Sequence, residues 1–168
     1  MVNRSKNMYW YEGSTLMYHL ENVHISSDYN HVECRFPVQS VIRPQTIEHQ
    51  DFRGFAGRID GGVFKPGDRI KTLPSGFISK IKTIELNGNQ LSEAYAPMSV
   101  TMTLEDEIDI SRGDMIVREN NMPNVSQDIE LLVTWMNQSP LTKRKKVIIK
   151  HTTNECIGLV AVSYTHLT

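Results

Sequence analysis

The chain has 168 residues, a formal net charge of −1 and a hydrophobic fraction of 39%. This length suffices for one ordinary domain or two small ones, and the charge excludes a general electrostatic attraction to DNA, RNA or anionic membranes. No apolar run reaches membrane-spanning length, and the polar first residues show no signal-peptide pattern. The composition predicts a soluble cytoplasmic protein with no membrane or nucleic-acid partner.

The first predicted element is a short helix from Ser14 to Asn22. Thr15 and the residues just before it are typical helix starters, and apolar residues follow at helical spacing. The aromatic run Tyr9-Trp10-Tyr11 precedes this helix. It fits packing between the helix and the rest of the chain better than a stacking platform for a base.

From residue 32 onward the pattern changes to short apolar runs separated by turn residues, which predicts strands. Lys65-Pro-Gly-Asp68 predicts a tight turn, and Asn87-Gly88-Asn89 predicts a hairpin turn. Strands this short and this regularly spaced predict a closed antiparallel β-barrel. The predicted strands are Val32 to Val41, Gly54 to Ile59, Arg69 to Leu73, Phe77 to Leu86, Ser99 to Leu104 and Asp114 to Val117.

A second all-β unit is predicted after Arg118, beyond a polar linker from Glu119 to Asn124. Three strands do not close a barrel, so this unit is expected to be incomplete, with open edges. Its predicted strands are Asp128 to Trp135, Val147 to Lys150 and Ile157 to Val162.

Metal and redox chemistry find little support in the sequence. Cys34 and Cys156 have no CxxC partner, which favours buried thiols over a disulfide or a metal site. No two of the six histidines form an HxH or HxxxH pair. The acids from Glu105 to Glu107 match no metal-binding loop, so a solvated turn is the better interpretation.

Basic residues gather in two places. Arg35, Arg43, Arg53 and Arg58 fall in one short window, either as a site for phosphate or an acidic partner or as a solvated surface with local ion pairs. The run from Lys143 to Lys146 fits a solvated hairpin better than a nucleic-acid contact.

Several motifs occur in an order that resembles the large, GTP-binding subunit of sulfate adenylyltransferase. In that family, barrel domains of the translation-factor type follow a GTPase domain. The resemblance covers Met1 to about Val160, and one departure is Tyr9, where the family usually has proline. The motifs that carry it are Asn3 to Gly13, RFPVQ from Arg35 to Gln39, DFRGFAG from Asp51 to Gly57, LPSG from Leu73 to Gly76 and DISRGD from Asp109 to Asp114.

The resemblance implies a fragment with four parts. Residues 1–23 would be the C-terminal tail of a missing GTPase domain, and residues 24–118 a translation-factor-like β-barrel, similar to the second domain of elongation factors. Residues 119–162 would be an incomplete second β-barrel domain. Residues 163–168 no longer resemble the family and are expected to be a non-native tail.

For the parent protein, the resemblance implies GTP hydrolysis coupled to formation of adenosine 5′-phosphosulfate from ATP and sulfate. A catalytic small subunit would be the partner, and GTP and Mg²⁺ would bind in the missing domain. This chain has no GxxxxGK[ST] loop, so we expect no catalytic, cofactor-binding or metal-binding residue in it. Functional residues would then face a partner or another domain, and the candidates are Tyr9, Trp10, Arg35, Arg53 and Arg58.

The alternative is a translation-factor-type barrel module that binds tRNA or another partner. The shared barrel pattern and the basic run from Lys143 to Lys146 motivate it. The near-neutral charge of the chain counts against tRNA binding.

Overall fold

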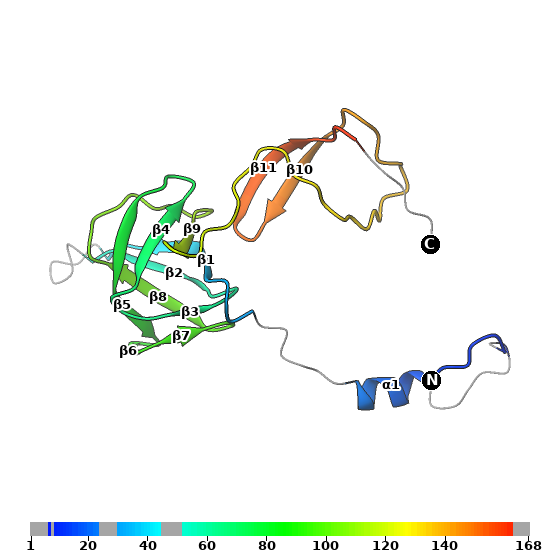
Figure 1. The fold of residues 1–168 in the computed structure, drawn as a ribbon, viewed down its shortest axis with the longest axis horizontal. Coiled ribbons are helices and arrows are strands. Elements are labelled where there is room, and N and C mark those ends of the chain that lie inside the picture. The colour runs from blue at the N-terminus through cyan, green and yellow to red at the C-terminus, as the bar shows by residue number, and fades with distance from the viewer. Residues whose placement is uncertain (1–6, 8, 24–29, 45–51, 163–168) are drawn as a thin grey trace.

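The computed structural model describes residues 7, 9–23, 30–44 and 52–162 (Figure 1). Within them, one short helix is followed by strands, and most of the strands gather in one β domain, which we define as residues 34–118. The predicted non-native tail, residues 163–168, lies outside the described residues. The elements are α1 (Leu16–Asn22), β1 (Arg35–Ile42), β2 (Gly54–Arg58), β3 (Val63–Phe64), β4 (Arg69–Leu73), β5 (Ile78–Leu86), β6 (Asn89–Gln90), β7 (Ala94–Tyr95), β8 (Ser99–Leu104), β9 (Met115–Arg118), β10 (Lys146–His151) and β11 (Asn154–Leu159).

The strands of the β domain pair in the order β4-β9-β1-β2-β8-β5, and β5 pairs in turn with β4. Every one of these pairings is antiparallel. The mainly-β, antiparallel fold predicted from the sequence is confirmed. Because β1 joins β2 on one side and β9 on the other, it brings residues from opposite ends of the domain's sequence together.

The core lies inside this arrangement of strands and is built from aromatic and β-branched side chains. Phe36, Phe55 and Phe64 are fully buried, and the rings of Phe36 and Phe64 meet edge to face with centroids 6.4 Å apart. Full burial of one such side chain stabilises the fold by about 1.5–3 kcal/mol. Alternation along the strands directs these residues inward, as in β8, where Val100 and Met102 are buried.

The six strands predicted between residues 32 and 118 are present as β1, β2, β4, β5, β8 and β9, with ends that differ by a few residues. The Asn87-Gly88 turn is also confirmed, since both residues have positive φ, 51° and 81°, as a type I′ hairpin turn requires. The sequence analysis missed β3, β6 and β7, because a two-residue strand is too short to show alternation.

Helix α1 begins where the sequence predicts, with the side chain of Thr15 accepting a hydrogen bond of 3.3 Å from the backbone N–H of Tyr18. The helix nevertheless buries none of its residues. Tyr9 and Trp10 are also exposed, and Figure 1 shows α1 apart from the β domain. The expected packing of this aromatic run between helix and barrel is therefore wrong for the described chain.

The C-terminal part of the chain differs most from expectation. β10 and β11 form the predicted hairpin, but residues 128–135 form no strand. A strand needs a partner for its backbone N–H and C=O groups, and no described residue pairs with this segment. Its apolar side chains are exposed, and Leu132 is 98% accessible.

The two cysteines differ in their exposure to solvent. Cys34 is buried at the start of β1, as predicted, whereas Cys156 lies on the exposed hairpin, so its predicted burial is wrong. The turn of the hairpin comes close to the β domain: a Cβ added to Gly113 would lie 3.6 Å from the backbone oxygen of Thr153. Within the described ranges, no helix is long and apolar enough to cross a membrane.

Candidate functional site

The best-ordered polar arrangement lies where the chain leaves the β domain after β9. Arg35 Nη1 lies 2.9 Å from the backbone oxygen of Cys34, 2.7 Å from the backbone oxygen of Asn121 and 2.9 Å from Asn121 Oδ1. Asn121 Oδ1 also accepts a hydrogen bond of 3.0 Å from the backbone N–H of Cys34. We call these three residues, Cys34, Arg35 and Asn121, the exit clamp, because they tie the first linker residues to β1.

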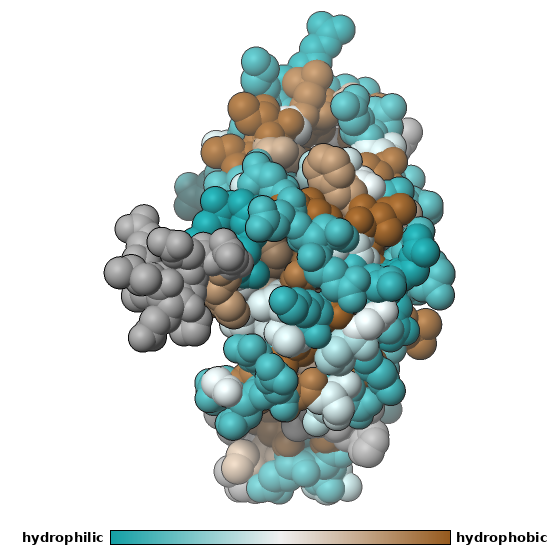
Figure 2. Space-filling view, turned by 90° about the vertical axis from the view of Figure 1, so that its left-hand side faces the viewer, coloured by the Kyte–Doolittle hydropathy of each residue, from teal (hydrophilic) through white to brown (hydrophobic). Residues whose placement is uncertain are grey.

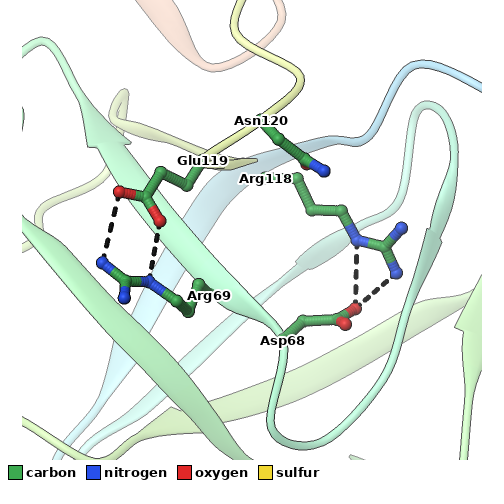
Figure 3. Close-up of a pocket in the computed structure, with 5 residues that line it drawn as sticks. All are labelled: Asp68, Arg69, Arg118, Glu119 and Asn120. Carbon is green, nitrogen blue, oxygen red and sulfur yellow. Dashed lines mark hydrogen bonds and ion pairs between the residues drawn. The ribbon is translucent and has the colours of Figure 1, made fainter.

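Two ion pairs lie beside each other (Figure 3), formed by residues at the start of β4 and at the end of β9. Arg118 donates to Asp68 Oδ2 through Nη2 at 2.6 Å and through Nε at 3.1 Å. Arg69 Nε lies 2.7 Å from Glu119 Oε2, and Arg69 Nη2 lies 3.3 Å from Glu119 Oε1. Together with Asn120 these side chains line a pocket of about 260 Å³.

The charges of this pocket cancel, because two arginines face two carboxylates. The arrangement therefore acts as a cross-link between β4, β9 and the linker rather than as an anion-binding site. Fork-shaped guanidinium–carboxylate contacts add geometric precision to such a link. The sequence analysis did not identify these pairs, since only the register of β4 against β9 brings Asp68 and Arg118 together.

The predicted turn from Lys65 to Asp68 supports the same cross-link. The backbone N–H of Lys65 donates to Asp68 Oδ2 at 2.8 Å, and Gly67 has a φ of 88°. One carboxylate oxygen thus holds the turn and also accepts from Arg118. The turn is structural, as the sequence analysis proposed.

Of the four arginines that the sequence places in one window, only Arg43 and Arg53 converge. The register of β1 against β2 pairs Ile42 with Gly54, so the next residue outward on each strand is an arginine. The Nη2 atoms of Arg43 and Arg53 lie 3.6 Å and 3.8 Å from Asp109 Oδ1. Arg53 Nη1 also donates to the backbone oxygen of Ile108 at 2.5 Å.

The five predicted surface residues do not form one surface. Arg35 serves the exit clamp, and Arg53 lies at the Asp109 cluster. Arg58 is exposed at the end of β2, where its backbone pairs with Ser99 of β8, and its side chain makes no hydrogen bond or ion pair to any part of the chain that the structure describes. Tyr9 and Trp10 are exposed in the N-terminal segment. Their roles at a partner or domain interface stay predictions.

The other polar clusters have structural explanations. Asp106 accepts a hydrogen bond of 2.7 Å from Ser79 Oγ, which fits the solvated-turn interpretation of the acidic run. Lys145 Nζ lies 5.6 Å from the centre of the Trp135 ring, a cation–π distance. The described residues contain no group of three or more His, Cys, Asp or Glu side chains placed to hold a metal ion.

The surface of the β domain shows no large apolar face in Figure 2, where hydrophilic side chains cover most of the view and separate smaller brown areas. A second hollow of about 210 Å³ lies over β1, β2, β5 and β8 and is lined mainly by small and polar side chains. Neither hollow contains a set of groups suited to nucleophilic or acid–base catalysis.

Comparison with known sequences gives close relatives. The chain is 49% identical over 160 residues to the bifunctional enzyme CysN/CysC of Rhodopirellula baltica, covering 95% of the chain and 24% of that protein. It is 46% identical over 154 residues to sulfate adenylyltransferase subunit 1 of Bacteroides fragilis, covering 92% of the chain and 32% of that protein. The chain thus spans about a quarter to a third of the length of these curated relatives. No protein-family model matches it.

Comparison with solved structures gives the same fold at low sequence identity. Sup35 complexed with GMPPNP aligns with a TM-score of 0.63 at 16% identity, covering 90% of this chain and 36% of Sup35. Translation elongation factor SelB from Methanococcus maripaludis, in complex with a GTP analogue, aligns with a TM-score of 0.60 at 18% identity, covering 84% of this chain and 31% of SelB. At these identities the likeness establishes a translation-factor-like fold and gives no support to tRNA binding.

Proposed function

Since the chain corresponds over most of its length to a segment of sulfate adenylyltransferase subunit 1 proteins, we propose that it is the β-domain region of such a subunit. The observation that carries this proposal is the 46–49% identity over 92–95% of the chain. The chain spans only 24–32% of those relatives, so the activity described next belongs to the whole protein.

The parent protein, in this proposal, takes part in forming adenosine 5′-phosphosulfate from ATP and sulfate. A sulfate oxygen attacks the α-phosphorus of ATP, and the bond from that phosphorus to the β-phosphate bridge breaks, releasing pyrophosphate. GTP hydrolysis elsewhere in the same subunit drives the step. GTP and Mg²⁺ would bind in a nucleotide domain that this chain lacks, and a cytoplasmic location fits an enzyme that uses both ATP and GTP.

The partner would be the catalytic small subunit, which performs the adenylyl transfer. The name "subunit 1" places the Bacteroides fragilis relative in a multi-subunit enzyme. Residues that face this partner or the nucleotide domain are proposed to include Tyr9, Trp10, Arg53 and Arg58. Arg35 would act indirectly, by fixing the linker through the exit clamp.

The domain division follows from the same proposal. Residues 1–23 would complete a nucleotide domain, which fits the exposure of every residue of α1. Residues 24–118 would be the first barrel, and residues 119–162 the start of a second. The unpaired segment 128–135 and the hairpin, which has no buried residue, fit a second barrel that is incomplete in this chain. Residues 163–168 would be a non-native tail.

The chain itself would contribute a rigid body rather than chemistry. Coupling between two sites requires states that differ in how bodies are arranged. The ion pairs of Arg69 and Arg118 and the exit clamp hold residues 118–121 against β4 and β1. A movement of the β domain would therefore also move the residues that follow the linker.

A chimera tests the proposal. In the Bacteroides fragilis subunit, the matched segment is replaced by this chain's residues, and the protein is assayed with its catalytic partner for GTP-dependent formation of adenosine 5′-phosphosulfate. We expect activity within about tenfold of the parent. A folded chimera that hydrolyses GTP but leaves sulfate activation uncoupled would contradict the proposed function.

A further inference from the structure

Two arginines flank the end of the β1–β2 ladder where the chain connects β1 to β2, and the proximity of two like charges needs an explanation. Arg43 and Arg53 follow the last paired residues, Ile42 and Gly54. Like charges directly opposite each other on neighbouring strands are destabilising. Such a pair persists when an anion bridges it, and here the bridge is the carboxylate of Asp109.

The bridge is loose, and most of the arginine donors have no partner among the residues that the structure describes. The distances of 3.6 Å and 3.8 Å to Asp109 Oδ1 exceed hydrogen-bond length. Arg53 Nη1 donates a hydrogen bond to the backbone oxygen of Ile108. The side chain of Arg43 makes no hydrogen bond to any residue in the described ranges. Among the described residues, the carboxylate of Asp109 neutralises one of the two positive charges.

All three side chains are at least partly exposed to solvent. The side chain of Asp109 is 85% exposed, that of Arg43 54% and that of Arg53 25%. The exposed carboxylate can swing away at little cost, because ion pairs of this kind are worth only about 0–1 kcal/mol. The half-buried Arg53 would stay in place, and its guanidinium group would remain accessible to the partner.

We propose that Arg43 and Arg53 form a docking point for an acidic side chain of a partner protein, with Asp109 occupying the position of that carboxylate in the free chain. The inference rests on the proposed function, which supplies a protein partner. A protein carboxylate fits better than a phosphate, because the group already held there is a carboxylate on an open surface.

Binding of a fluorescein-labelled hexaglutamate peptide, followed by fluorescence anisotropy at low ionic strength, tests the proposal on the 168-residue chain. Arg43→Ala should weaken binding about two- to fivefold, as expected for loss of one partly exposed ion pair. Asp109→Asn should strengthen binding, because it removes the competing carboxylate. Lys82→Ala, at an exposed site on β5, is the matched control and should leave binding unchanged.

The Asp109→Asn result is decisive when it is compared with Glu107→Gln, an exposed acid nearby, since the loss of any negative charge raises the attraction for an acidic peptide and only a docking point predicts a larger gain at Asp109. Unchanged or weaker binding by Asp109→Asn, or a gain no larger than that of Glu107→Gln, would overturn the proposal. An equal loss in Lys82→Ala would also overturn it, as it would show only diffuse charge attraction. Displacement of the peptide by inorganic phosphate at matched charge concentration would show a small-anion site instead.

A second variant separates charge from shape. Arg53→Lys keeps the charge but not the planar fork, and it should weaken peptide binding while circular dichroism shows an intact fold. These results are independent of the chimera assay. Failure of peptide binding with a working chimera would remove the docking point alone, whereas an uncoupled chimera would remove the proposed function.

Discussion

At the scale of single residues, the most connected side chain is Asn121. Its oxygen accepts from the backbone of Cys34 and from Arg35, which itself lies at the edge of the core. A part-buried donor that loses its acceptor costs about 1–3 kcal/mol. The position of Asn121 in a polar linker gives no hint of this role, because its partners are some 86 residues away along the chain.

Asn121→Ala should therefore lower the free energy of unfolding by about 1–3 kcal/mol. Urea unfolding followed by far-ultraviolet circular dichroism is the suitable measurement, since Trp10 and Trp135 both lie outside the β domain and would not report on it. Asn124→Ala, an exposed site in the same linker, is the control and should change stability by less than about 0.5 kcal/mol. Equal effects of the two changes would remove the exit clamp as a stabilising feature.

At the scale of the elements, the strands of the β domain and the C-terminal hairpin behave differently. The six longer strands of the domain, β1, β2, β4, β5, β8 and β9, each have buried residues and each pair with at least two neighbours. The hairpin β10–β11 pairs only with itself, and Ile148 and Ile157 face each other across it while remaining exposed. Two-stranded hairpins are marginal in water without further packing.

Phe36→Ala is expected to destabilise the β domain by about 3–5 kcal/mol, because it removes a fully buried ring that packs on Phe64. Phe77→Ala, at a largely exposed site beside β5, should cost less than about 1 kcal/mol. The urea midpoints of the two variants make the comparison. Similar urea midpoints for the two variants would mean that burial of Phe36 does not stabilise the β domain as expected.

The exposed hairpin predicts a solubility effect. Changing both Ile148 and Ile157 to Thr should reduce binding of a hydrophobic dye and reduce self-association in light scattering, since it removes a cross-strand apolar pair from an open sheet. The thermal midpoint of the β domain should not move, because neither residue belongs to its core. A drop in that midpoint would show that the hairpin packs on the domain more tightly than described.

At the scale of the whole molecule, the role proposed for the chain is that of a scaffold rather than of a nucleotide-binding domain. The relatives that it matches are three to four times longer, and this chain has no phosphate-binding loop of the GxxxxGK[ST] type. Its described residues contain tight structural cross-links, one open arginine pair and exposed apolar segments at both sides of the β domain.

Isothermal calorimetry should show no binding of GTP to the chain at micromolar concentrations, in the presence of Mg²⁺. The full-length Bacteroides fragilis subunit 1 serves as the positive control. Micromolar affinity in the chain itself would contradict a scaffold role and would require a nucleotide site of another kind.

The sequence alone determined the mainly-β class, the positions of six strands, the glycine turns and the resemblance to one enzyme subunit. These features depend on local patterns, namely the alternation of apolar residues, turn residues and ordered motifs. Such patterns can be recognised without knowing which segments lie next to each other in the fold. It did not determine that residues 128–135 stay unpaired, that Cys156 is exposed or that only Arg43 and Arg53 converge out of four arginines. Those outcomes depend on which strands lie side by side, and pairing between distant segments is set by the tertiary structure.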